Sequence, residues 1–117
     1  MAQARLIKIA ELQSLLPPKH TNTHAFTIID QNSVGAKQFE LFLTEVHPGG
    51  EAKEDVHPVS EHAIFMISGV GEAVVEGERF IVNPSECLYL PPGAKHSMKP
   101  VGGQTIRFIV VTSPPGH

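Results

Sequence analysis

The stretch Cys87-Leu88-Tyr89-Leu90-Pro91-Pro92-Gly93-Ala94-Lys95-His96 decides the fold of this chain. Its first four residues predict a short strand, and the prolines and glycine that follow predict a rigid turn. The histidine comes directly after that turn. Because a stiff turn holds the next side chain at a fixed place, His96 is the first candidate for a functional residue.

A second stretch with histidines, Asp55-Val56-His57-Pro58-Val59-Ser60-Glu61-His62, lies just before the apolar run 63–67. Side chains alternate along a strand, so His62 shares one face with Ile64 and Met66. If that face points into a barrel, His57, His62 and His96 can meet in its interior. Neutral imidazole is the commonest protein metal ligand, and three of them leave coordination positions open, as catalytic metal sites do.

Short apolar segments recur along the chain, separated by ten prolines and ten glycines. We expect strands at 6–9, 26–30, 38–46, 63–67, 71–75, 78–82, 87–90 and 106–112, and one or two helical turns over 10–16. Glu76-Gly77 predicts a hairpin turn, and Pro48-Gly49-Gly50 is expected to end the strand before it. Antiparallel strands in this number protect their edges best by closing into a barrel. The sequence therefore predicts an all-β jelly roll with a short N-terminal helical segment.

The strand predicted over 38–46 has apolar residues on both faces. One set of alternating positions contains Phe39, Leu41, Leu43 and Glu45, and the other contains Glu40, Phe42, Thr44 and Val46. The alternation alone does not choose which set faces the interior.

Composition limits the partners and the compartment. The chain has 117 residues, enough for one domain over 1–117, which we divide into an N-terminal arm (1–21) and a core of about 22–113. A net charge of −3 argues against nucleic acid, and no apolar run has the length of a membrane helix. The first residues do not resemble a signal peptide, so we expect a cytoplasmic protein. The lone Cys87 excludes an internal disulfide and is expected to be a buried, inert thiol.

These motifs resemble those of the cupin superfamily, in particular its small single-domain members of the conserved-barrel type. Pro91-Pro92-Gly93 with His96 matches the centre of the second cupin motif, although Ser85 and Pro100 replace the Gly and Asn at its two ends. Gly69 matches the glycine that ends the first motif.

Counting back from Gly69 places His62 at the glutamate of the first motif, His57 at its second histidine and Asp55 at its first histidine. The resemblance implies a double-stranded β-helix. It also implies one divalent transition metal ion, with His57, His62 and His96 as ligands and Asp55 as a candidate fourth. Fe, Mn, Ni, Zn and Cu all suit such a set.

The leading hypothesis for function is a metal-dependent enzyme acting on a small polar molecule. Without an obvious internal base, the site favours an oxygenase. The alternatives are isomerase, lyase or decarboxylase chemistry on a sugar acid or carboxylate, and a non-catalytic module that binds a sugar.

Two further residues are candidates for catalysis. Tyr89 either donates a proton inside the barrel or packs in its wall, and Arg107 either clamps a substrate carboxylate or lies at the surface. We expect a homodimer, for which Phe65 and Ile67 on the face opposite His62 suit the contact; packing under another sheet is the alternative.

Overall fold

Strands account for nearly all of the regular structure. A computed structural model describes residues 2–53 and 56–116. Its strands are β1 (Thr21–Ile29), β2 (Glu40–Lys53), β3 (Glu61–Ser68), β4 (Val70–Val75), β5 (Glu78–Val82), β6 (Cys87–Leu90), β7 (His96–Val101) and β8 (Ile106–Ser113). The helical segments are η1, a 3₁₀ turn (Ile9–Glu11), and α1 (Gln31–Val34). The all-β prediction is confirmed, and the helical content is minor.

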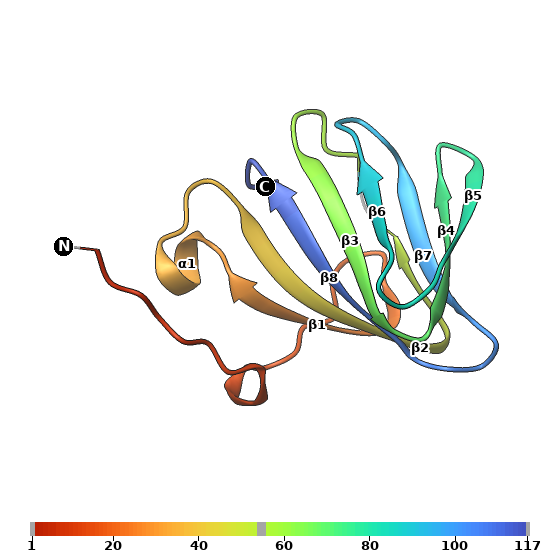
Figure 1. Cartoon of the computed structure of the whole chain (residues 1–117), viewed down its shortest axis with the longest axis horizontal. Coiled ribbons are helices and arrows are strands. Elements are labelled where there is room, and N and C mark those ends of the chain that lie inside the picture. The colour runs from red at the N-terminus through yellow and green to blue at the C-terminus, as the bar shows by residue number, and fades with distance from the viewer. Residues whose placement is uncertain (1, 54–55, 117) are drawn as a thin grey trace.

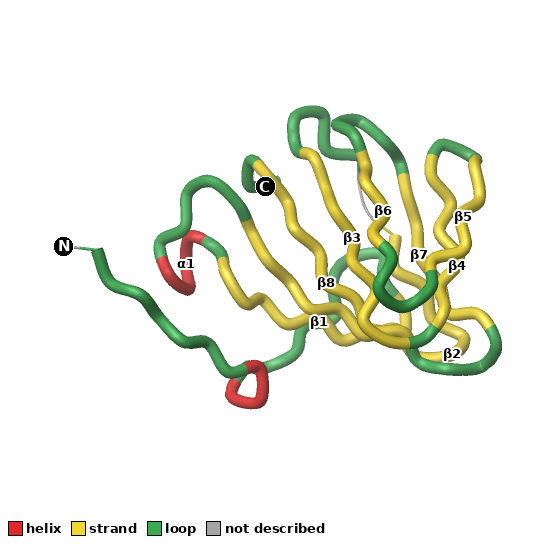
Figure 2. Tube along the Cα trace, in the orientation of Figure 1, coloured by secondary structure: helices red, strands yellow, loops and turns green. Residues whose placement is uncertain are grey.

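The strands form a nearly closed antiparallel barrel with the order β5-β4-β7-β2-β8-β3-β6, and β1 pairs with β2 (Figure 1). The β2 strand is 14 residues long and belongs to both halves of the barrel. Its first part pairs with β1 and β8, and its last residues, Ala52 and Lys53, pair with β7. Figure 2 shows the loops gathered at the two ends of this barrel.

The prediction that Pro48-Gly49-Gly50 ends a strand is wrong, because β2 continues to Lys53. The pairing with β1 shifts from Thr23↔Val46 to Thr21↔Glu51, so residues 47–50 form a bulge. A bulge bends a strand without ending it, and here it carries β2 from one half of the barrel to the other.

One face of each strand forms the core. Ile106 lies opposite Val46 and Phe108 opposite Met66, and all four side chains are buried. The full cluster contains Val46, Ala52, Ile64, Met66, Ala73, Val82, Leu90, Met98, Ile106 and Phe108. His62 lies on the same face as Ile64 and Met66, so the predicted face is the interior one.

The structure differs from the local predictions at three places. The β7 strand was not predicted, because Lys95, Lys99 and Pro100 interrupt its hydrophobic pattern. Hydrogen-bonded pairing with β2 and β4 stabilises the extended backbone there, although the local sequence has little strand propensity. Conversely, no strand forms at 6–9, and the helix predicted over 10–16 is only η1.

The N-terminal arm runs along the outside of the molecule (Figure 1). Its contacts include a single bridge from Leu15 to Ala25 and a hydrogen bond from Arg5 to the Ser33 carbonyl. Most side chains of residues 2–19 are exposed, which leaves too little apolar burial to support regular structure.

The predicted hairpin at Glu76-Gly77 is confirmed. These two residues join β4 to β5 with φ angles of 48° and 83°, as a two-residue hairpin turn requires. Among the described residues, no helix has the length and apolar character needed to cross a membrane. Phe65 and Ile67 lie on the outer face and are 43% and 40% exposed; the homodimer stays a prediction.

Candidate functional site

Three histidines from separate segments meet at one end of the barrel. His57 lies in the loop between β2 and β3, His62 is the second residue of β3, and His96 is the first residue of β7. The ring centres of His57 and His62 are 5.3 Å apart, and those of His62 and His96 are 5.4 Å apart. His62 and His96 are 6% and 8% exposed. The structure therefore brings together the three imidazoles that the sequence singled out.

Backbone contacts hold this cluster in place. The amide of Gly93 donates to the His57 carbonyl at 2.8 Å, which ties the proline-rich turn to the loop before β3. His62 is fixed by its pairing with Thr112 of β8 and Leu90 of β6. His96 places its Nδ1 3.2 Å from the Ala94 carbonyl oxygen. Each ring is thus positioned by a different strand or turn.

The donor set suits a divalent transition metal ion. In the tautomer that donates from Nδ1 to Ala94, the Nε2 of His96 keeps its lone pair, an arrangement common in metal-binding histidines. An imidazole bound at about 2.1 Å has its ring centre about 3.2 Å from the ion, which separates neighbouring ligand rings by about 4.5–5.5 Å. The two measured separations lie in this range.

The three rings are nevertheless not arranged as a complete set of metal ligands. Within residues 2–53 and 56–116, no three His, Cys, Asp or Glu side chains are placed so that they could hold a metal ion. The assignment of His57, His62 and His96 as ligands therefore stays a prediction. Asp55, the candidate fourth ligand, lies outside the described residues.

A buried carboxylate that the sequence did not single out lies at the same end of the barrel, in the interior region around His57, His62 and His96 that we call the histidine chamber. Glu40 pairs with Thr112, and Thr112 pairs with His62, so these three side chains form one row across β2, β8 and β3. Their exposures are 4%, 3% and 6%. Strand alternation could not identify Glu40, because both faces of β2 contain apolar residues. Glu40 is identified by the strand register, which aligns it with Thr112 and His62.

The structure does not bring Tyr89 or Arg107 into this chamber. Tyr89 pairs with Ala63 on the outer face, is 58% exposed, and donates its hydroxyl to Glu61 at 2.6 Å. This bond to a carboxylate raises the pKa of Tyr89 because it favours the neutral phenol. Arg107 lies opposite Glu45 and donates to its carboxylate at 2.7 Å. Both residues alternate with inward-facing neighbours, which turns them outward.

The buried state expected for Cys87 is also wrong. The thiol is exposed, because Cys87 lies opposite Phe65 and shares its outward orientation. Its neighbours predicted a strand correctly, but β6 ends the strand order and has a solvent-exposed outer face.

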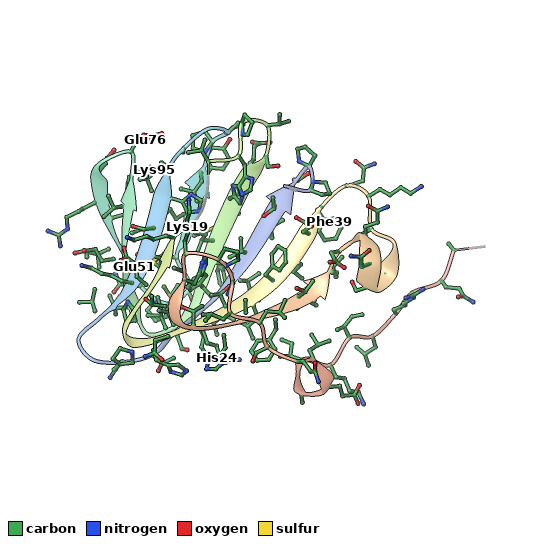
Figure 3. All side chains as sticks on the ribbon, turned by 180° about the vertical axis from the view of Figure 1, so that it is seen from behind. Lys19, His24, Phe39, Glu51, Glu76 and Lys95 are labelled. Atoms are coloured by element: carbon green, nitrogen blue, oxygen red, sulfur yellow. The ribbon has the colours of Figure 1, made fainter. Side chains whose placement is uncertain are left out.

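One groove of the described surface lies along the outside of the barrel wall. It has a volume of about 610 Å³, and His96 is among its lining residues. Three others, Lys53, Val74 and Ser97, form one register row whose side chains point away from the interior face that carries His96. Figure 3 shows two further lining residues, Glu76 and Lys95, at the upper end of the molecule. We therefore separate this groove from the histidine chamber.

A second histidine pair lies at the other end of the barrel. His24 and His47 have ring centres 5.1 Å apart, and His24 appears at the lower end in Figure 3. His47 places its Nδ1 2.9 Å from the Thr105 hydroxyl. Because this pair is remote from the chamber, it offers control positions for mutagenesis.

A cupin-domain family model matches residues 42–112, so the chain belongs to the cupin family. A curated relative is "Tetracenomycin polyketide synthase protein TcmJ" of Streptomyces glaucescens, 28% identical over 95% of this chain and 74% of the relative. Another is "Polyketide synthase CurC" of Streptomyces cyaneus, 24% identical over 92% of this chain and 70% of the relative.

Solved structures agree with this assignment. The polyketide cyclase RemF from Streptomyces resistomycificus has a TM-score of 0.81 and 28% identity, covering 95% of this chain and 80% of RemF. A predicted oxalate decarboxylase from Thermotoga maritima has a TM-score of 0.83, covering 94% of this chain and 99% of that one, but at 12% identity it supports the fold alone.

Proposed function

We propose that this chain is a metal-dependent cupin enzyme that closes rings in carbonyl-rich substrates of the polyketide type. The observation that carries the proposal is the cluster of His57, His62 and His96 at one end of the barrel, next to its buried apolar core. The likeness to a polyketide cyclase over most of both chains supports the substrate class. The oxygenase reaction that the sequence favoured is the second candidate, because the same imidazoles suit it.

The three imidazoles would hold the ion, which when bound polarises carbonyl oxygens and stabilises negative charge that develops on them. Beneath them, the buried side chains of Ile64, Met66 and Leu90 exclude water from the reacting centre. A low-dielectric wall strengthens every electrostatic interaction in the chamber. Because water is excluded, a substrate bound beside His62 is protected from hydrolysis that would compete with ring closure.

Elemental analysis of protein purified without chelators tests the metal. We expect a stoichiometric transition metal in the unmodified protein, its loss in His62→Ala and His96→Ala, and its retention in the control His24→Ala. A metal-free protein, or a metal that survives both chamber substitutions, would contradict the proposal.

Turnover assays separate the two reactions. A synthetic linear triketone should be converted to a cyclic product, followed by its ultraviolet absorbance, without consumption of oxygen. Oxygen uptake that depends on His62 would favour the oxygenase instead. A protein that binds the triketone without metal or turnover would be a binding module.

A further inference from the structure

We propose that segment 114–116, which follows β8, closes the histidine chamber and has to move away before a substrate reaches the imidazoles. The inference rests on the proposed function, because it assigns the control of access to that same site. The backbone of the segment lies beside His57 and Thr112, where a substrate bound at the histidines would have to lie. A protein that covers its own site binds ligand only in its open fraction.

The position of Gly116 is the first observation. A Cβ atom built on this residue would lie 3.4 Å from His57 Nδ1 and 3.3 Å from Thr112 Cγ2. Thr112 pairs with His62 in the register of β8 and β3, so the two side chains are neighbours on the interior face. Pro115 and Gly116 are themselves half-buried. A substrate atom placed between His57 and Thr112 would therefore meet the backbone of residue 116.

Hydrogen bonds on both sides of β8 hold the segment in this position. The Ser60 hydroxyl, just before β3, donates to the Pro114 carbonyl at 2.6 Å, and Ser60 is 3% exposed. The amide of Gly116 donates at 3.2 Å to Oε1 of Glu40, the first residue of β2. Since β8 lies between β2 and β3, the segment crosses the row of interior side chains at the end of these three strands.

The residues of the segment allow it to detach without disrupting the sheet. The β8 strand ends at Ser113, which pairs with Glu61 at the start of β3 (Figure 1). Two prolines follow, and because proline has no N–H, neither donates a hydrogen bond to a neighbouring strand. The amide of Gly116, the next donor, bonds to a side chain. Opening therefore breaks the bonds from Ser60 and to Glu40 and leaves the pairing of β8 intact.

The bond from Ser60 sets part of the balance between the closed and the open chamber. Loss of one hydrogen bond between neutral groups shifts an equilibrium by about 3- to 10-fold. The apparent dissociation constant of a ligand that binds only the open state is the intrinsic constant divided by the open fraction. Removing the Ser60 hydroxyl should therefore raise the open fraction, and it should lower the apparent dissociation constant by the same factor.

The first test compares Ser60→Ala with the control Thr23→Val. The Thr23 hydroxyl also belongs to a side chain 3% exposed and donates to a backbone carbonyl, that of Thr21, at 2.7 Å. It lies next to His24, at the end of the barrel remote from the chamber. The control thus removes a comparable hydrogen bond without touching the segment.

Two rates are measured in metal-free protein. Hydrogen exchange of the Gly116 amide is followed by nuclear magnetic resonance, and carbethoxylation of His57 by diethyl pyrocarbonate is followed by peptide mass spectrometry. We expect both rates to be about 3- to 10-fold higher in Ser60→Ala and unchanged in the control. His24 should react equally fast in Ser60→Ala and in the unmodified protein. Equal rates at Gly116 and His57 in these two proteins would overturn the inference.

The second test needs no substitution. Acetylacetone, a diketone that does not cyclise, is added to the metal-loaded unmodified protein. Its binding should displace the segment, so exchange of the Gly116 amide should become faster as the ligand saturates. Binding that leaves this exchange unchanged or slows it would show that the ligand reaches its site with the segment in place, which contradicts the inference. In Ser60→Ala, the calorimetric dissociation constant should be about 3- to 10-fold lower.

These outcomes separate the inference from the proposed function. The rates at Gly116 and His57 require neither metal nor turnover, so they test closure by itself. The expected rates in a protein without metal and turnover would overturn the proposed function and leave the closure of the chamber standing. Metal and turnover together with unchanged rates in Ser60→Ala would overturn the inference alone.

Discussion

Replacing Gly69 with alanine should destabilise the protein more than the same change at Gly77. Both glycines have left-handed backbone, with φ angles of 78° and 83°. The cost of placing alanine in that conformation, about 1–2 kcal/mol, is therefore common to both variants. Their surroundings differ, so the comparison isolates the effect of packing.

The magnitude follows from the contacts of the added methyl group. At Gly69 the new Cβ would lie 2.5 Å from the Thr105 carbonyl oxygen and 3.1 Å from the Ile106 Cα, both backbone atoms, so the start of β8 must move. At Gly77 nothing lies within 4 Å. Overpacking of this kind costs about 1–3 kcal/mol. We expect the free energy of unfolding to fall by about 2–5 kcal/mol for Gly69→Ala and by about 1–2 kcal/mol for Gly77→Ala.

Urea unfolding followed by far-ultraviolet circular dichroism measures both values. The denaturant slope should be the same in the two variants, so that the midpoints report stability directly. Free energies of unfolding that agree within about 0.5 kcal/mol would refute the reasoning, because the backbone contact at Gly69 would then have no energetic cost.

Three further results are expected. The pKa of Tyr89, the only tyrosine, is raised by its hydrogen bond to Glu61, and in spectrophotometric titration Glu61→Gln should lower it; an unchanged curve would contradict the bond. Since the folded pKa is raised, this bond stabilises the fold below the pKa of unfolded tyrosine, and its contribution is lost as the pH rises through the folded value. The exposed thiol of Cys87 should react with a disulfide reagent in the native protein as fast as in the unfolded chain, and a protected thiol would contradict its placement. Met66→Ala, at a fully buried position, should cost about 2–5 kcal/mol, whereas Ile67→Ala on the outer face should cost much less; similar losses would contradict the assignment of faces.

Local sequence patterns were sufficient to predict most of the strands. The Glu76-Gly77 turn and the strand over 87–90 agree with prediction, because both depend on residues that are neighbours in sequence. The long strand β2 was predicted only in part, since its bulge is defined by a register with β1 that no local pattern encodes. For the same reason the polar strand β7 was missed, although His96, at its start, was identified.

The candidate site also contains residues that the sequence identifies and residues that only the structure identifies. His57, His62 and His96 are recognisable by residue type and by their places beside turns and strands. Glu40 is an ordinary strand residue by sequence, and only its register with Thr112 and His62 places it in the chamber. The same alternation turns Tyr89 and Arg107 outward, which no local pattern could have decided.

The amino-acid sequence by itself determined the all-β class, the Glu76-Gly77 turn and the identity of the imidazoles, because turn chemistry and side-chain periodicity act over a few residues. Only the tertiary structure decided which face of each strand is interior and which polar groups lie beside the histidines. Side-chain direction has a period of two residues, so a shift of one position exchanges the two faces, and long-range pairing alone sets that position.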